Sequence, residues 1–235
     1  MTSPDSTLIL NKFELSQGDG IHIFGSECVR AASKIEANYR TSSYDHRDAL
    51  PNFTPDSPFY LEQYRVGYAC FKREVAHVLQ PKVILEIGIG VGIGALAMMD
   101  GAPEAIYRGI DNNEADFPVI PRIKPTEFVS AALESKRYNY HIKIANSREL
   151  SEIPRADLVH VDGDHSREAA RNDVTLAWKS GAVWILCDDA RDTNVVTGIF
   201  EALAIDLDRG SADWAYFPDT WTGSILIRTD HKRAT

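Results

Sequence analysis

The sequence has few cysteines, no long apolar run and no excess of basic residues, and each absence excludes a class of protein. The three cysteines, Cys28, Cys70 and Cys187, are odd in number and far apart, which argues against a disulfide framework or a zinc site. No apolar stretch approaches the length of a membrane-spanning helix, and the polar start MTSPDST lacks the basic and apolar segments of a signal peptide. We therefore expect a reduced, cytoplasmic protein.

The negative charge balance limits the kinds of partner that the protein is expected to bind. The formal net charge is -9 at pH 7, whereas a nucleic acid or an anionic membrane surface demands a basic face. We therefore expect a small-molecule partner, and neither nucleic acid nor membrane. The chain of 235 residues has no repeat and no low-complexity tract, and it is long enough to bury one full α/β core.

From about residue 57 onward, helical and strand patterns alternate along the chain. The strand patterns are VILEIG, YRGID, YHIKIA, ADLVHVD, AVWILCDD, WAYFP and GSILIRT, of which the last two are expected to form a closing hairpin. Strands rich in Val, Ile and Leu that alternate with helices predict a mostly parallel sheet covered on both faces. The fold class is therefore α/β, with a doubly wound, mostly parallel seven-stranded sheet over residues 57–235.

Residues 1–56 do not follow this alternation. The segment NKFELSQGDGIHIFGSE predicts a small hairpin, and CVRAASKIEANYR predicts a helix. We interpret residues 1–56 as an N-terminal helical extension. Two roles stay open: a lid over the ligand pocket, or plain packing and contact in a homo-oligomer.

A glycine-rich turn follows the first strand of the alternation. LEIGIGVGIGA places Glu86 in the strand and then Gly88, Gly90 and Gly92 before a helix, where glycine lets the backbone turn tightly and approach a ligand. Two interpretations compete. GVGIGA approximates a dinucleotide fingerprint. The whole stretch, however, resembles motif I of class I S-adenosylmethionine-dependent methyltransferases, which implies a Rossmann-like methyltransferase fold. The resemblance implies that the loop holds the amino-acid part of the cofactor and that Glu86 interacts with its ammonium group.

Polar residues follow the next two strands. In doubly wound sheets the ligand lies at the carboxyl ends of the strands, and a carboxylate such as Asp111 at that place can accept both hydroxyls of a ribose. This applies equally to S-adenosylmethionine and to NAD. Asn146 and Ser147 follow the third strand, where the resemblance implies contacts with adenine.

Acidic residues end the fourth and fifth strands, in LVHVDGDH and WILCDDA. Neighbouring strands lie about 4.8 Å apart, so Asp162, Asp188 and Asp189 should crowd together at one edge of the sheet. Such carboxylates either take up protons or are compensated by a cation, and oxygen ligands favour Mg²⁺ or another hard divalent ion. Strand alternation sends Asp188 and Asp189 to opposite faces, so both can bind one ion only if the chain bends there.

This order of motifs, from about Ser57 to Thr229, resembles metal-dependent small-molecule O-methyltransferases of the catechol and macrolide-sugar types, together with the cephalosporin-hydroxylase-like group. The adjacent pair is Asp-Asn in the catechol type and Glu-Asp in the sugar type, but Asp-Asp here. The resemblance implies Asp162, Asp188 and Asp189 as metal ligands and His165, three residues after Asp162, as the catalytic base.

The function predicted from the sequence is S-adenosylmethionine-dependent, Mg²⁺-dependent methylation of a hydroxyl on a small, specialised metabolite such as a sugar, a catechol or a polyketide. Two alternatives stay open. One is an NAD(P)-dependent oxidoreductase of similar architecture, and the other is a non-catalytic nucleotide-binding partner of the hydroxylase-like group.

Overall fold

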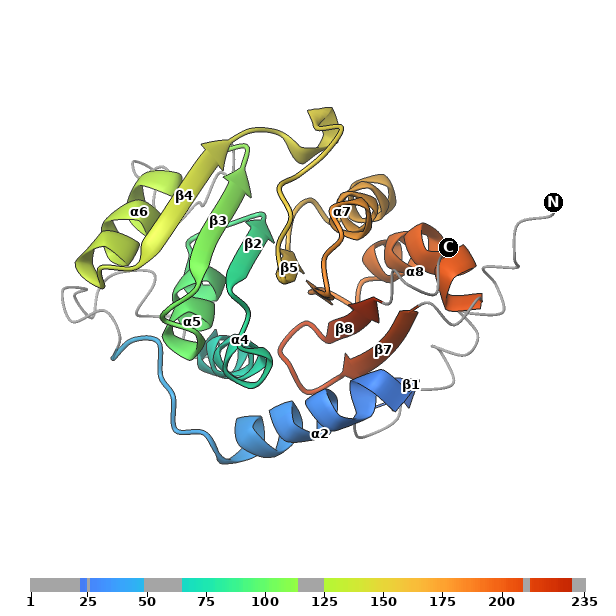
Figure 1. Cartoon of the computed structure of the whole chain (residues 1–235), viewed down its shortest axis with the longest axis horizontal. Helices are drawn as coiled ribbons and strands as arrows, with labels where there is room; N and C mark the ends of the chain where they lie inside the picture. The colour runs from blue at the N-terminus through green and yellow to red at the C-terminus, as the bar shows by residue number, and fades with distance from the viewer. Residues whose placement is uncertain (1–21, 25, 49–64, 114–124, 209–211, 230–235) are drawn as a thin grey trace.

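A single sheet organises the part of the chain that the computed structural model describes, which is residues 22–24, 26–48, 65–113, 125–208 and 212–229. Eight strands run in the order β1-β7-β8-β6-β5-β2-β3-β4 (Figure 1). They are β1 (His22–Phe24), β2 (Val83–Ile87), β3 (Ile106–Asp111), β4 (Asn139–Ile144), β5 (Leu158–Val161), β6 (Trp184–Cys187), β7 (Ala212–Phe217) and β8 (Ser224–Thr229).

The strand directions confirm the predicted doubly wound sheet. The five strands from β6 to β4 are parallel, and β8 lies between β6 and β7 and is antiparallel to both. The parallel part of the sheet begins with β2 and extends outward through β3 to β4. The chain then returns to β5 on the other side of β2, so the topological switch point lies between β2 and β5. All seven predicted strands are present.

The eighth strand, β1, was not predicted as part of this sheet. It pairs antiparallel with β7, with His22 opposite Tyr216. The segment that contains it was predicted to form a hairpin, and the rest of that segment lies outside the described residues apart from the start of the next helix. A three-residue strand whose partner is far away in the sequence leaves no periodic signal of its own.

Helices cover both faces of the sheet. On one face lie α2 (Ser26–Thr41), α4 (Arg65–Leu79), α5 (Ile93–Gly101) and α6 (Pro125–Ser135), and on the other lie α7 (Arg167–Lys179) and α8 (Thr193–Asp208). A short 3-10 helix, η1 (Ser147–Glu149), follows β4. Alternation along the strands divides the core in two: Ile84 and Leu158 pack under α4 and α5, while Leu85 and Val159 pack under α7 and α8. The next residues of that alternation, Glu86 and His160, therefore point toward the α4 face.

The N-terminal helix was predicted and is present as α2. It packs against α4, β7 and β8, and the residues of α2 do not line the described pocket. The lid role of residues 1–56 stays a prediction, since residues 1–21 and 49–64 lie outside the described residues.

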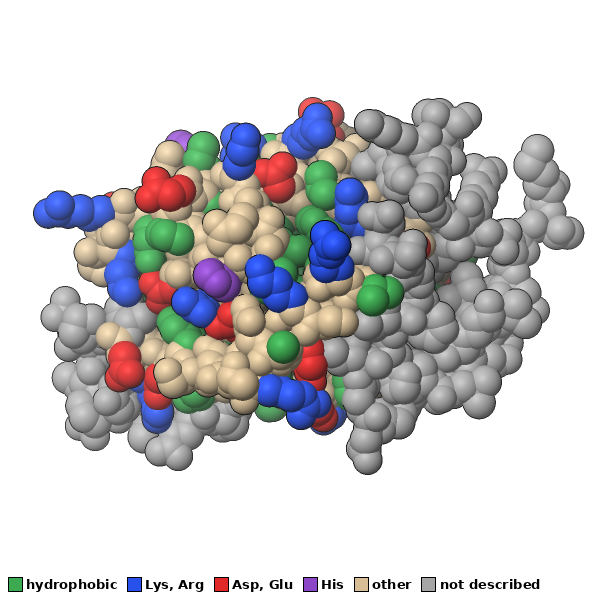
Figure 2. Space-filling model, turned by 60° about the horizontal axis from the view of Figure 1, so that its bottom comes forward, with side chains coloured by type: hydrophobic (Ala, Val, Ile, Leu, Met, Phe, Trp, Pro, Cys, Tyr) green, Lys and Arg blue, Asp and Glu red, His purple; other side chains and the backbone are tan. Residues whose placement is uncertain are grey.

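The described surface mixes charges of both signs. On the face turned forward in Figure 2, Lys and Arg side chains are interspersed with Asp and Glu, and apolar side chains form small separate areas. Within the ranges that the structure describes, no helix combines the length and the apolar character required to cross a membrane.

Candidate active site

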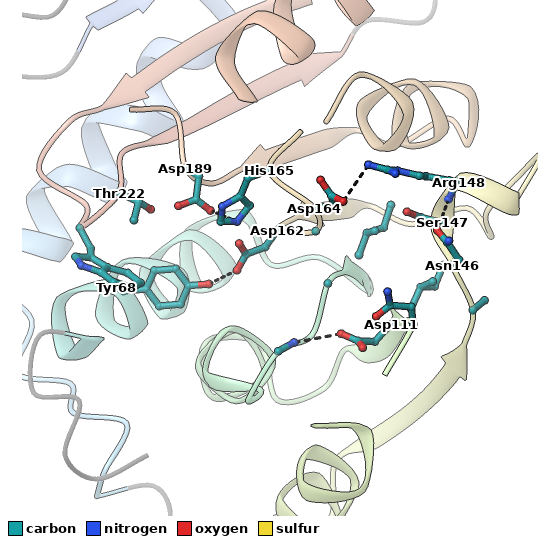
Figure 3. A pocket seen from close by; sticks show the side chains of 18 residues that line it. Tyr68, Asp111, Asn146, Ser147, Arg148, Asp162, Asp164, His165, Asp189 and Thr222 are labelled. Carbon is teal, nitrogen blue, oxygen red and sulfur yellow. Dashed lines mark hydrogen bonds and ion pairs between the residues drawn. The ribbon is translucent and has the colours of Figure 1, made fainter. Parts of the chain in front are cut away.

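A pocket of about 680 Å³ opens at the carboxyl ends of the parallel strands. Its lining comes from the loops after β2, β3, β4, β5 and β6, from α4, and from the turn between β7 and β8 (Figure 3). The volume is within the range that small-molecule sites occupy, roughly 300 to 1,000 Å³. Its position at the switch point of the sheet is the one predicted for a ligand site.

The glycine turn forms one wall of this pocket. Gly88 and Gly90 line it, and Gly88 has a φ of 83°, in the left-handed region that favours glycine. A Cβ at Gly88 would overlap the carbonyl oxygen of Asp162, so the absence of a side chain lets the β2 and β5 loops meet. Gly92 is not among the described lining residues; a Cβ there would overlap the Val129 side chain of α6. Gly92 therefore serves the packing of the helices.

Asp111 lies at the end of β3 beside the glycine turn. Its Oδ2 accepts hydrogen bonds from the backbone N–H groups of Ile89 (2.8 Å) and Gly90 (3.3 Å), and its Oδ1 accepts one from that of Asn113 (2.6 Å). Asp111 also lines the pocket. A carboxylate has about four acceptor positions, so this side chain both fixes the glycine turn and retains capacity for a ligand hydroxyl.

Asn146 and Ser147 line the same end of the pocket. Asn146 caps η1 by accepting a hydrogen bond from the backbone N–H of Arg148 (3.0 Å). The Arg148 guanidinium donates to Asp164 Oδ2 (2.9 Å) and to Ser166 Oγ (2.6 Å). These bonds join the loop after β4 to the loop after β5 across the pocket wall (Figure 3).

Glu86 is placed differently from the other predicted cofactor residues. Its side chain is buried on the α4 face, where it accepts a hydrogen bond from the Tyr107 hydroxyl and where its Oε1 lies 2.7 Å from His160 Nδ1. Glu86 is not among the described residues that line the pocket. Its role toward the ammonium group of a cofactor stays a prediction.

The opposite end of the pocket is acidic. Asp162 and Asp189 both line it, and His165 Nε2 lies 3.1 Å from Asp189 Oδ2. The hydroxyl of Tyr68 donates to Asp162 Oδ2 at 2.7 Å. One ligand atom from each of Asp162, His165 and Asp189 lies within 4.8 Å of the others (Figure 3). Asp189 has a φ of 55°, the bend that turns its side chain to the pocket.

Electrostatics at this end reflects the crowding of carboxylates. Burial, followed by repulsion from Asp188, raises the pKa of Asp162 to about 7. The hydrogen bond to Asp189 raises the pKa of His165 to about 9 although partial burial opposes this. The pocket therefore stabilises positive charge beside Asp162 and Asp189.

Asp188, the third predicted metal ligand, does not line this pocket among the described residues. It is 2 % exposed, forms an ion pair with Lys72, and accepts hydrogen bonds from His160 Nε2 (2.9 Å) and Ser224 Oγ (2.8 Å). Burial opposes its ionisation, but Lys72 and His160 hold the pKa of Asp188 well below its ordinary value. Its ligand role stays a prediction, and both of its oxygens already have partners.

Several residues of the site were not identified from the sequence. They are Tyr68, Lys72 and His160, none of which was predicted as a site residue. Lys72 follows Tyr68 by four residues and so lies on the apolar stripe of α4, where it is completely buried. A cation on the buried stripe of a helix is a signal that an internal carboxylate lies opposite.

The chain was compared with known proteins. Neither a protein-family model nor a curated protein matches the sequence. Solved structures do match. A methyltransferase from Podospora anserina, PaMTH1, bound to S-adenosylhomocysteine (SAH), is 16% identical with a TM-score of 0.51 and covers 97% of each chain.

Two bacterial structures are similar at the same level. The O-methyltransferase TomG from Streptomyces achromogenes, in complex with S-adenosylmethionine and involved in tomaymycin synthesis, is 14% identical with a TM-score of 0.56 over 87% of this chain and 99% of that one. An O-methyltransferase from Bacillus cereus in complex with SAH is 12% identical with a TM-score of 0.53 over 95% and 97%. The chain thus has the Rossmann-like methyltransferase fold that the sequence predicted.

Proposed function

We propose that this protein is an S-adenosylmethionine-dependent O-methyltransferase that acts on a hydroxyl of a small metabolite with the help of a divalent cation such as Mg²⁺. The observation that carries the proposal is that the two ends of one pocket differ. A glycine turn with Asp111 forms one end, and Asp162, His165 and Asp189 form the other. A nucleotide fits the first end, and a hydroxyl that must lose a proton fits the second.

The nucleotide end supports S-adenosylmethionine. Gly88 and Gly90 allow close approach of the backbone to a ligand, and Asp111 retains acceptor capacity for ribose hydroxyls. Asn146 and Ser147 line the same end of the pocket, and we assign the adenine ring to them. Structures with this fold contain S-adenosylmethionine or SAH in the proteins from Podospora, Streptomyces and Bacillus. Bound S-adenosylmethionine supplies a methyl group on a sulfonium centre.

The acidic end fits a hard divalent cation. Asp162 and Asp189 offer carboxylate oxygens within 4.8 Å of each other, next to a pocket that has room for a substrate. We assign the cation to these two residues, because both Asp188 oxygens already accept hydrogen bonds or ion pairs. A bound cation lowers the pKa of a hydroxyl that it contacts, which makes the oxygen a better nucleophile.

His165 is proposed to accept the proton of the hydroxyl. It lines the pocket beside Asp162 and Asp189, and its side chain is about half exposed, so a substrate can reach it. Asp189 orients the ring through the contact with Nε2. The hydrogen bond to Asp189, together with the negative charges of Asp189, Asp162 and Asp192, raises the pKa of His165 to about 9.

Calorimetry with SAH and with NAD tests the cofactor. We expect SAH to bind and NAD not to bind, because a methyltransferase does not need a nicotinamide subsite. Binding of NAD alone would instead support the oxidoreductase alternative. Transfer of a labelled methyl group is then measured on catechol, on a methyl glycoside with a vicinal diol, and on a hydroxylated aromatic polyketide. SAH binding without transfer to any hydroxyl would support the non-catalytic partner.

Cation binding is tested without turnover first, and the need for the cation in turnover is tested afterwards. Binding of Mn²⁺, followed by electron paramagnetic resonance, is expected for the wild type and should weaken by about tenfold or more in Asp189→Asn, because one anionic ligand is lost. Asp219→Asn removes an exposed carboxylate outside the pocket lining and is the matched control. EDTA should lower the rate of methyl transfer by about tenfold or more. Full activity in EDTA would remove the cation from the proposal.

A further inference from the structure

Asp188 is the centre of a buried polar network that the proposed reaction does not use directly. Its Oδ1 contacts Lys72 of α4 and accepts a hydrogen bond from Ser224 Oγ of β8 at 2.8 Å. Its Oδ2 lies 2.9 Å from His160 Nε2 of β5. One carboxylate at the end of β6 therefore joins three other elements.

One branch of the network leads from Asp188 to the acidic end of the pocket. The Lys72 ammonium group lies 4.7 Å from the centre of the Tyr68 ring, a cation–π geometry, and it also pairs with Asp188. The hydroxyl of Tyr68 donates to Asp162 Oδ2 at 2.7 Å. Lys72 thus fixes the ring of the residue that orients Asp162.

A second branch leads to the turn between β7 and β8. Ser224 Oγ lies 2.9 Å from Thr220 Oγ1, and both side chains are buried. The turn between them carries Trp221 and Thr222, which line the pocket. The Trp221 ring stands edge-on to Tyr68 with 6.0 Å between ring centres. The two branches therefore meet again at the pocket wall.

Backbone contacts join this turn to Asp189. The N–H of Ala190 donates to the carbonyl of Gly223 (3.1 Å), and that of Arg191 donates to the carbonyl of Thr222 (3.0 Å). Two backbone hydrogen bonds thus join the segment that carries Asp189 to the turn that carries Trp221 and Thr222 as one unit. Asp188, one residue before Asp189, attaches this unit to α4 and to the sheet.

The charges explain why this carboxylate is held so firmly. Lys72 and Asp188 are both buried, with exposed fractions of 0% and 2%, and a buried charge is stable only when it is paired and hydrogen-bonded. Lys72 gives Asp188 the compensating charge that a bound cation gives a metal ligand. Both Asp188 oxygens are consequently satisfied inside the protein.

We propose that Asp188 is a positioning residue, whose contacts with Lys72, His160 and Ser224 hold Asp162, Asp189 and the Trp221–Thr222 turn around the substrate end of the pocket. The proposal rests on the proposed function only for its kinetic readout. It replaces the role of metal ligand predicted for Asp188 and adds Lys72, Tyr68 and Ser224 to the residues that shape the site.

The test cuts the branch from Asp188 to the turn. Ser224→Ala removes the hydroxyl that joins Asp188 to Thr220. Thr229→Val is the matched control, because it removes a buried hydroxyl hydrogen bond on the same strand, to the carbonyl of Ala182, outside the network. Both variants are labelled with 5-fluorotryptophan, and Trp221→Phe assigns the fluorine signal of Trp221 among those of the four tryptophans.

We expect the Trp221 fluorine signal to shift or broaden in Ser224→Ala and to be unchanged in Thr229→Val. For the acceptor that the wild type methylates, KM should rise by about tenfold in Ser224→Ala with little change in kcat, because the turn that lines the substrate end is held less firmly while the reacting groups are unchanged. An unchanged Trp221 signal in Ser224→Ala, or an equal shift in both variants, overturns the proposal.

Two other outcomes of this test, a variant that does not fold and a wild type that methylates no acceptor, can be told apart. If Ser224→Ala does not fold, Thr220→Ala cuts the same branch one hydrogen bond farther on, and the same shift of the Trp221 signal is expected. If the wild type methylates no acceptor, the proposed function fails, whereas the fluorine spectra still test whether the branch from Asp188 through Ser224 holds the Trp221–Thr222 turn. A failure of one proposal is therefore distinguishable from a failure of the other.

Discussion

Among the described residues that line the pocket, His165 carries the only imidazole, and it lies 3.1 Å from Asp189. If it accepts the proton of the substrate hydroxyl, His165→Ala should lower kcat at saturating substrate by about 10²- to 10⁴-fold, the usual contribution of a general base. The rate of methyl transfer measures this. His141→Ala, an exposed histidine on β4, is the control and should leave kcat within about twofold. Equal rates in wild type and His165→Ala would remove His165 from the mechanism.

Asp173, on α7, should make the free energy of unfolding depend on pH. Burial raises its pKa, against hydrogen bonds from Ser147 and Asn172 and the attraction of Arg148, and Asp164 adds repulsion. A raised carboxyl pKa in the folded state means that folding favours the protonated form. The contribution to stability is therefore present at low pH and is lost as the pH rises through the folded pKa.

At pH 8, Asp173→Asn should consequently have a free energy of unfolding higher than that of the wild type by on the order of 1 kcal/mol. It should therefore unfold at a higher temperature. The difference should shrink toward pH 4, where the wild-type carboxyl becomes protonated. Thermal unfolding of both proteins across this range measures the effect. A stabilisation that is the same at pH 4 and pH 8 would contradict the assignment to the charge of Asp173.

At the scale of elements, Gly88 lets the turn from β2 to α5 meet the loop after β5. Gly88 has a φ of 83°, and a Cβ there would overlap the Asp162 carbonyl. Gly181 has a similar φ of 77°, but the atom nearest to a Cβ there, Arg155 Nε, would be 4.0 Å away. Gly181→Ala should therefore cost only the left-handed backbone penalty, about 1 to 2 kcal/mol in the free energy of unfolding. Gly88→Ala adds the overlap, about 1 to 3 kcal/mol more, and should abolish SAH binding.

Urea unfolding and calorimetry with SAH compare these two variants. The matched pair separates backbone strain from steric overlap, because both glycines have nearly the same φ. If Gly88→Ala bound SAH as the wild type does, the loops after β2 and β5 would not need to touch, and the glycine turn would have no part in the cofactor site.

Strands β2 to β8 and the helices that cover the sheet were predictable from the sequence, since each leaves a local pattern, whereas the short strand β1 does not. Alternating apolar runs and helical stripes depend only on near neighbours in the chain, so VILEIG and ADLVHVD identify β2 and β5 directly. The acidic ends of β5 and β6 were predictable for the same reason. Parallel neighbours bring their carboxyl ends to one edge.

The partners of individual side chains were less predictable. Strand alternation shows that Glu86, His160 and Asp188 share a face, but it does not show that Lys72 of α4 lies opposite them. That contact depends on how α4 packs on the sheet, which is a tertiary property. The left-handed backbone of Asp189, with a φ of 55°, was not predictable from a local pattern either, whereas its separation from the face of Asp188 follows from strand alternation.

At the scale of the whole molecule, the sheet connects the two ends of the pocket. The switch point between β2 and β5 places the glycine turn next to Asp162, and the antiparallel β8 brings the Trp221–Thr222 turn alongside β6. A cofactor bound at the first end therefore contacts loops that belong to several strands at once. Binding should stabilise the folded chain as a whole.

SAH should therefore raise the melting temperature of the full chain. At a free concentration of about 100 times its Kd, mass action adds about 2.7 kcal/mol to the free energy of unfolding. For a chain of this size, each kcal/mol shifts the melting temperature by about 2 to 4 °C, so a rise of about 5 to 10 °C is expected. Differential scanning calorimetry with increasing SAH measures it.

The same experiment with NAD and with EDTA separates the parts of the site. NAD should leave the melting temperature unchanged, since the pocket is proposed to hold the methyl donor. EDTA should leave the SAH-induced rise intact, because Asp111, Asn146 and Ser147 at the nucleotide end are distinct from Asp162 and Asp189 at the acidic end. A rise that occurs with NAD but not with SAH assigns the pocket to a dinucleotide, and loss of the SAH effect in EDTA makes the two ends of the pocket one coupled site.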